Sequence, residues 1–174
     1  MEREHDLMRI SHHIDFLLAV LIFIIILFFS AATYMRWVGM SFFMGSLRFS
    51  HWLTIIGTSY IAIATPAFVI LKRFYPQKMR GLFRFHIFGN LAFFTLISIH
   101  FASQMGRPAA NFPELGLGLA MYIAMALQVA SGFTQRFAFT ERINLKTNKF
   151  IHASLIMVFY IVILFHVLHG FGII

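Results

Sequence analysis

Two apolar stretches of the chain each carry two histidines at the same spacing, and histidine is a common metal ligand. The first stretch, RFHIFGNLAFFTLISIH, contains His86 and His100, and the second, FIHASLIMVFYIVILFH, contains His152 and His166. In both pairs the second histidine follows the first by fourteen residues. On an α-helix this spacing returns to within ~40° of the starting face after a rise of ~21 Å. Each pair is therefore predicted to lie on one face of its helix.

A separation of ~21 Å places one histidine near each edge of a ~30 Å hydrocarbon layer when the helix crosses a membrane. Two such helices running in the same direction would set His86 opposite His152 and His100 opposite His166. Opposed histidines can ligate a haem iron from both sides, so the pattern predicts two bis-histidine haems stacked across a bilayer. Zinc fits less well, because its usual ligand set is compact and tetrahedral.

The composition supports a membrane location. Of the 174 residues, 60% are hydrophobic and only 11% are charged, whereas soluble domains carry about a quarter charged residues. We expect an all-α integral membrane protein in which residues 1–174 form a single transmembrane domain around a haem-binding four-helix bundle. Spanning helices would use nearly the whole chain and leave no room for a flavin or nucleotide domain. Five stretches are long enough to span, at about residues 14–35, 50–71, 85–105, 114–133 and 150–172.

The chain contains no cysteine. This excludes thiolate ligands, iron–sulfur clusters and covalently attached c-type haem. The two predicted haems are therefore held by histidine, without a covalent link to the chain.

The positive charges divide unevenly between the two predicted sides of the membrane. With five spans, the N-terminus and the second and fourth loops share one side and hold 11 of the 14 Lys and Arg residues. The other side holds Arg36, Arg48 and Arg107. Cytoplasmic loops carry the excess of basic residues, so we expect a cytoplasmic N-terminus and an outer C-terminus in the cell (plasma) membrane. The net charge of +8 then reflects orientation, and no nucleic-acid partner is predicted.

Two residues beside His86 are candidates for further contact with a haem. Gly89 lies on the same face as His86 and has no side chain, so a macrocycle could approach the backbone there. Arg84 immediately precedes the helix face that carries His86, at the inner membrane edge, and could pair with a haem propionate. A basic residue at this edge can equally anchor the helix to lipid headgroups.

Four other histidines lie near the predicted membrane edges: His12 and His13 on the inner side, and His51 and His169 on the outer side. Because histidine titrates near neutrality, each is a candidate to exchange protons with a quinone. A capping or interfacial position explains each of them equally well. His169 follows His166 by three residues and could replace it as a ligand.

The stretch RFHIFGNLAFFTLISIH resembles the first haem-binding helix of cytochrome b in the respiratory bc complexes, with an Arg before the first His, a Gly after it and the second His fourteen residues on. Ligands on the third and fifth helices also resemble the transmembrane domain of the ferric reductase and NADPH oxidase family, whose sixth helix and flavin and nucleotide domains are missing here. A third resemblance is to the small bacterial di-haem cytochromes b that anchor hydrogenases and formate dehydrogenases. That resemblance implies ligands at His13 and His51 in place of His86 and His100, with two more ligands on the last helix.

These resemblances imply electron transfer across the membrane between a quinone pool and a redox partner protein. Two other functions stay open on the sequence. One is a self-contained oxidoreductase that acts on superoxide or ferric iron at an exposed haem edge. The other is a haem-free transporter that uses its membrane histidines as proton relays.

Overall fold

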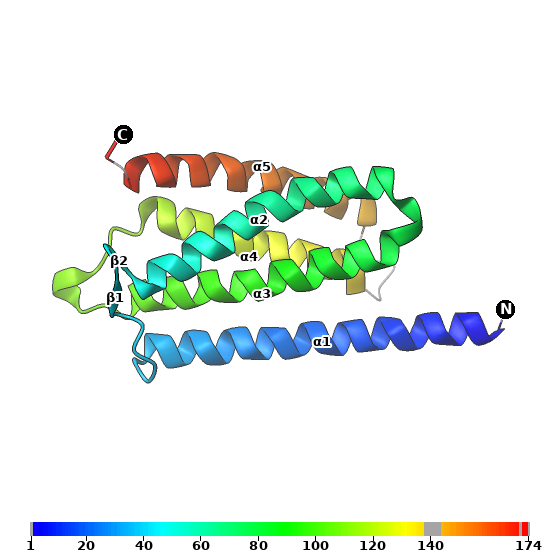
Figure 1. Cartoon of the computed structure of the whole chain (residues 1–174), viewed down its shortest axis with the longest axis horizontal. Helices are drawn as coiled ribbons and strands as arrows, with labels where there is room; N and C mark the ends of the chain where they lie inside the picture. The colour runs from blue at the N-terminus through cyan, green and yellow to red at the C-terminus, as the bar shows by residue number, and fades with distance from the viewer. Residues whose placement is uncertain (1, 138–143, 171, 174) are drawn as a thin grey trace. The chain divides into compact units, whose positions relative to one another are not determined.

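The computed structural model describes residues 2–137, 144–170 and 172–173 of the chain. Within them, the α-helices are α1 (Glu2–Tyr34), α2 (Phe49–Phe74), α3 (Met79–Met105), α4 (Gly116–Phe137) and α5 (Leu145–Gly170). The short strands β1 (Phe43–Met44) and β2 (Leu47–Arg48) lie between α1 and α2 (Figure 1). Two 3₁₀ turns, η1 (Pro76–Lys78) and η2 (Ala109–Asn111), lie in later connections between helices. In the described part of the chain, five helical segments are long and apolar enough to cross a membrane. The prediction of an all-α, multi-pass membrane protein is confirmed at this level.

Several helices continue past the apolar stretches that predicted them. The earlier starts are those of α1, α3 and α5, at Glu2, Met79 and Leu145 instead of about 14, 85 and 150, and α4 ends at Phe137 instead of about 133. The remaining ends differ from the expected positions by three residues or fewer. A hydropathy pattern marks only the length that matches the hydrocarbon layer, whereas backbone hydrogen bonding carries a helix on through polar residues.

The early start of α5 has a local cause. The Asn144 side-chain oxygen accepts hydrogen bonds from the backbone amides of Lys146 (3.0 Å) and Thr147 (3.2 Å). A side-chain oxygen at this position satisfies amides that have no partner inside the first turn of a helix. Asn144 is therefore the N-cap of α5, and the polar residues that follow it are helical.

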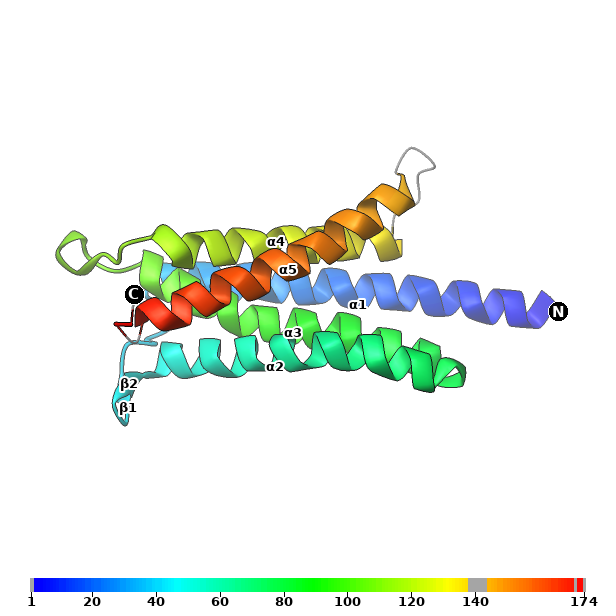
Figure 2. The same cartoon turned by 90° about the horizontal axis from the view of Figure 1, so that it is seen from above.

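The chain divides into two compact units, Met1–Gly106 and Arg107–Ile174. In the first unit, α3 packs against both α1 and α2, and it runs parallel to α1 and antiparallel to α2 (Figures 1 and 2). In the second unit, α4 and α5 form an antiparallel pair. The histidines of α3 therefore belong to the first unit, and those of α5 belong to the second.

The helices α2 and α3 approach each other closely at Gly57. A Cβ atom at this position would lie 2.8 Å from the carbonyl oxygen of Phe93 and 2.9 Å from the side chain of Ile97. Only glycine fits such a contact, which lets the two backbones come together. Ile97 is 2% exposed and lies at the centre of the first unit's core.

The end of α1 is fixed to the end of α3 by Arg36. The Arg36 backbone has a φ of 62°, in the left-handed region that usually favours glycine after a helix. The amides of Arg36 and Trp37 bond back to the carbonyls of Thr33 (3.1 Å) and Ala32 (2.8 Å). The guanidinium then donates from Nε (2.9 Å) and Nη2 (2.7 Å) to the carbonyl oxygen of Gly106. These contacts hold the C-terminal ends of α1 and α3 together.

Candidate functional site

Both histidines of α3 lie on the face of that helix that packs against α2. The His86 ring stacks on Phe68 of α2, with centroids 4.4 Å apart and planes inclined by 20°. His100 Nδ1 lies 2.9 Å from the carbonyl oxygen of Ser50, at the start of α2. Between the two histidines, Phe93 stacks on Tyr60 of α2 at 3.8 Å. The shared face predicted from the fourteen-residue spacing is thus the α2-facing side of α3.

The hydrogen bond of His100 determines which ring nitrogen carries the proton. A carbonyl oxygen can only accept, so the 2.9 Å contact with Ser50 requires a hydrogen on His100 Nδ1. In a neutral imidazole the other nitrogen, Nε2, then keeps its lone pair. Metal-ligating histidines have this arrangement, because a carbonyl or carboxylate partner fixes both tautomer and ring orientation.

His86 has a side-chain partner on its own helix. Its Nδ1 lies 3.2 Å from Nδ2 of Asn90, one turn further along α3. The Asn90 Oδ1 atom is buried without a hydrogen-bond partner. In this amide orientation Nδ1 of His86 is the acceptor and the proton lies on Nε2. Rotation of the amide by 180° would instead let Oδ1 accept from Nδ1–H, which satisfies the buried oxygen and places the lone pair on Nε2.

The space beside Gly89 is filled by a side chain of α2. The Tyr60 hydroxyl lies where a Cβ atom of residue 89 would be, so the glycine makes room for it. That hydroxyl is buried and has no hydrogen-bond partner. A macrocycle approaching the α3 backbone at Gly89, as the sequence suggested, would have to displace the Tyr60 side chain.

In the second unit, His152 of α5 is held by two groups of α4. Its Nδ1 lies 2.9 Å from Ser131 Oγ and 3.2 Å from the carbonyl oxygen of Gln128. The Ser131 hydroxyl itself donates to the Gln128 carbonyl at 2.9 Å, so its oxygen is left to accept from the histidine. Nδ1 of His152 is therefore protonated and Nε2 keeps its lone pair, as in His100.

Both histidines of α5 lie next to glycines of α4. A Cβ atom at Gly132 would lie 3.1 Å from His152 Cε1, and one at Gly118 would lie 3.7 Å from His166 Cε1. The two glycines are fourteen residues apart, as are the two histidines. Because α4 and α5 are antiparallel, equal spacing keeps both histidines in register with a glycine. This register was not predicted, although the matching spacing of the glycines and the histidines is visible in the sequence.

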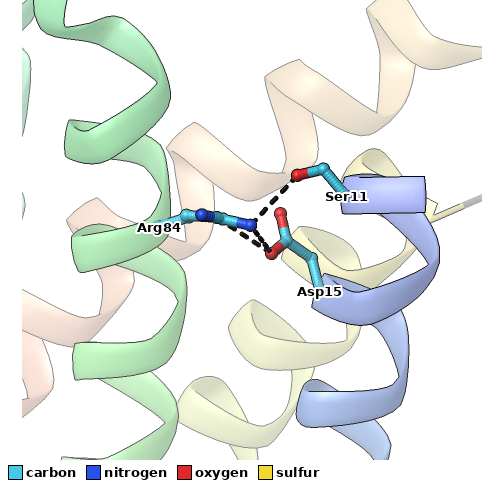
Figure 3. Close-up of polar contacts among 3 residues, drawn as sticks. All are labelled: Ser11, Asp15 and Arg84. Atoms are coloured by element: carbon cyan, nitrogen blue, oxygen red, sulfur yellow. Dashed lines mark hydrogen bonds and ion pairs between the residues drawn. The ribbon is translucent and has the colours of Figure 1, made fainter. Parts of the chain in front are cut away.

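Arg84 of α3 contacts two side chains of α1. Its Nε (2.9 Å) and Nη2 (2.8 Å) contact Oδ1 of Asp15, and Nη2 also donates to Ser11 Oγ at 3.0 Å (Figure 3). The Asp15 residue is 3% exposed, whereas the Arg84 side chain is 42% exposed. A buried carboxylate needs a paired cation, so Arg84 has a structural role that the sequence analysis did not anticipate. Its predicted pairing with a propionate stays a prediction.

The remaining candidate histidines differ in their surroundings. The His12 and His13 rings lie edge to face, 6.4 Å apart, near the start of the apolar part of α1, and His13 is exposed. His51 lies edge to face with His100, at 5.2 Å between centroids. His169 is exposed near the end of α5.

No group of three or more His, Cys, Asp or Glu side chains that could hold a metal ion occurs among the described residues. In His100 and in His152 the hydrogen bonds to carbonyl oxygens place the ring proton on Nδ1.

Comparison with known protein families, curated proteins and solved structures finds no match to this chain.

Proposed function

We propose that the chain is a di-haem membrane cytochrome b that transfers electrons across the bilayer. His86 and His152 would hold one haem b, and His100 and His166 the other. The N-terminus would lie in the cytoplasm and the C-terminus outside the cell (plasma) membrane, as the distribution of basic residues favours.

One observation supports this proposal most directly. Nδ1–H of His100 and of His152 is directed at a backbone carbonyl oxygen, on Ser50 and Gln128 respectively. Such a bond places the lone pair on Nε2 and raises the basicity of the imidazole. His152 belongs to one of the two proposed haem sites, and His100 belongs to the other.

When bound, haem would supply one-electron chemistry at potentials set by axial ligands, burial and nearby charge. The chain would provide the helix faces, on α3 and α5, that hold the two haems. On α3, Phe68 restrains the His86 ring. On α5, Ser131 restrains the His152 ring, and the small residues of α4 leave space beside it.

The proposed electron donor or acceptor inside the membrane is a quinone, and a redox partner protein would complete the transfer. His12 and His13 at one membrane edge, and His51 and His169 at the other, are the candidates for quinone proton exchange. His13 and His169 are exposed, which suits groups that must exchange protons with solvent.

The first experiment is a pyridine haemochrome assay with a reduced-minus-oxidised spectrum on purified full-length protein. The proposal requires two b haems per chain. Alanine variants then assign the ligands: His86→Ala and His152→Ala should each remove the same haem, and His100→Ala and His166→Ala the other. Thermal unfolding of each variant shows whether a lost haem reflects a lost ligand or a lost fold.

Two matched variants test the alternative ligands. His13→Ala and His51→Ala should each keep both haems. Loss of a haem in these variants would move the ligands to α1 and α2, as in the small bacterial di-haem cytochromes b. A colourless wild-type protein would refute the cytochrome and leave the transporter. Turnover of superoxide or ferric iron with a quinol analogue and no partner would indicate a self-contained oxidoreductase.

A further inference from the structure

The connection between α1 and α2 exposes an unusual number of large apolar side chains. Within residues 35–48, which we call the hairpin segment, Trp37 is 73% exposed and Phe43 is 65% exposed. Three others, Met35, Phe42 and Met44, are 47–57% exposed. The segment contains two arginines and no acidic residue. An exposed apolar patch of this kind marks a surface that contacts something other than water.

The backbone of the hairpin tip is internally hydrogen-bonded. Phe43 pairs with Arg48 and Met44 with Leu47, across a turn in which Gly45 has a φ of +68°. At the base of the tip, the amide of Phe49 donates to the carbonyl of Phe42 at 2.9 Å. Unpaired backbone groups are what keep loops out of a low-water environment. A tip whose backbone is paired can enter the lipid interface.

Side chains of α2 hold the hairpin segment against the start of α2. The Trp52 indole Nε1 donates to the carbonyl of Met44 at 2.9 Å. The rings of Phe42 and Phe49 stack at 4.8 Å between centroids, with planes inclined by 16°. The apolar side chains are therefore fixed at the end of two membrane-spanning helices, next to their lipid-facing surfaces.

Both arginines of the segment lie where their charges can remain near lipid headgroups. Arg36 is tied to the Gly106 carbonyl at the ends of α1 and α3. The Arg48 guanidinium lies over the Phe43 ring, 5.5 Å from its centroid. Arginine places its charge at the membrane surface while its stem covers apolar groups, and Trp is enriched at this depth.

We propose that the hairpin segment is an interfacial anchor, inserted among the lipids at the membrane–water boundary on the side where α1 ends. Its partner is the lipid layer itself: acyl chains against Phe43 and Trp37, and lipid phosphates against the arginines. The proposal depends on the membrane-spanning helices and not on the haems.

Spin labelling tests this directly, because the chain has no cysteine and each introduced cysteine is unique. Full-length Phe43→Cys carries a nitroxide label in vesicles of phosphatidylcholine and phosphatidylglycerol. Collision rates with oxygen, which concentrates in lipid, and with a water-soluble nickel chelate report depth. Leu27→Cys, at a highly exposed position in the apolar part of α1, and Gln77→Cys, in the exposed η1 turn, calibrate the two extremes.

The expected result is a severalfold higher ratio of oxygen to nickel collisions at Phe43→Cys than at Gln77→Cys, below that at Leu27→Cys. A ratio equal to that of Gln77→Cys would place the hairpin in water and overturn the proposal. Shielding from both reagents would show that protein covers the tip, from a second copy or a partner, and would also overturn it.

A second measurement needs no substitution and so avoids any failure of the variants to fold. Trp37 and Trp52 are the only tryptophans of the chain, and both lie at the hairpin. Lipids brominated near the headgroup should quench their fluorescence more than lipids brominated near the chain ends, and aqueous iodide should quench it little. Strong quenching by iodide with none by brominated lipid would overturn the anchor.

Discussion

Replacement of Gly132 by alanine should disturb His152, and the same replacement at Gly118 should leave His166 in place. The new Cβ atom at residue 132 would lie 3.1 Å from His152 Cε1 and 3.6 Å from Nδ1. Carbon atoms pack best at about 3.5–4.0 Å, so the ring must move by about 0.5 Å. At residue 118 the Cβ would lie 3.7 Å from His166 Cε1, which is already an ordinary contact.

The ring of His152 cannot move freely, because Ser131 and Gln128 hold its Nδ1 atom. A shift of about 0.5 Å away from α4 would stretch the 3.2 Å contact with the Gln128 carbonyl beyond hydrogen-bond range. A lost hydrogen bond costs about 1 kcal/mol, and overpacking of a tight contact costs about 1–3 kcal/mol. We therefore expect Gly132→Ala to destabilise the protein by about 1–3 kcal/mol relative to Gly118→Ala.

The pair of variants is well matched, because both make the same chemical change on α4. Thermal unfolding in detergent measures the stability difference. The haem content then reports on the proposed site: Gly132→Ala should weaken binding of the haem proposed at His152, and Gly118→Ala should keep both proposed haems. If Gly132→Ala proved as stable as Gly118→Ala and kept a full haem complement, the described contact between α4 and His152 would be refuted.

Three further substitutions test other contacts. Arg84→Gln should destabilise the first unit by up to about 3 kcal/mol in chemical unfolding, since it removes the Arg84 cation from the buried Asp15 carboxylate, although the exposed side of Arg84 lessens the cost. With the Asn90 amide turned so that Oδ1 accepts from His86 Nδ1–H, Asn90→Asp should lower the midpoint potential of the proposed His86 haem by roughly 40 mV in a redox titration, because a carboxylate is the stronger acceptor by about 1 kcal/mol. Arg36→Ala should lower the unfolding midpoint, because it removes two hydrogen bonds and keeps a backbone conformation that costs about 1–2 kcal/mol for residues other than glycine.

Each of these has an internal control. Arg80→Gln removes an exposed basic residue of the same helix and should change stability little. The double variant Asp15→Asn, Arg84→Gln should recover much of what Arg84→Gln loses. Asn90→Leu should raise the potential while Asn90→Asp lowers it; equal shifts would argue against a bond to His86. Arg36→Gly should fall between wild type and Arg36→Ala.

The sequence was sufficient to predict the five helices, because a hydrocarbon layer imposes both their length and their composition. It also predicted which positions share a face, since helix geometry alone puts His86, Phe93 and His100 on one side of α3. Which neighbour covers that face depends on tertiary packing. The close approach of α2 at Gly57 determines that Tyr60 fills the space beside Gly89.

The ion pair between α1 and α3 was harder to predict than the residues that share a helix face. Asp15 and Arg84 are 69 residues apart, and nothing local indicates that an acid near the start of one span meets a base near the start of another. The shared direction of α1 and α3 brings them together. The hydrogen bonds of His100 and His152 to backbone carbonyls could not be predicted either. Every residue has a backbone carbonyl, so the sequence does not show which one will accept.

The register of α4 against α5 also constrains how this chain can change in length. Residues added to the connection after Phe137 leave Gly118 beside His166 and Gly132 beside His152, because each helix keeps its own spacing. Deletion of a single residue between His152 and His166 would turn one histidine by ~100° relative to the other and move it ~1.5 Å along the axis. Relatives of this chain should therefore vary in length in the connection, and insertions inside either helix should appear only together with a matching change in its partner.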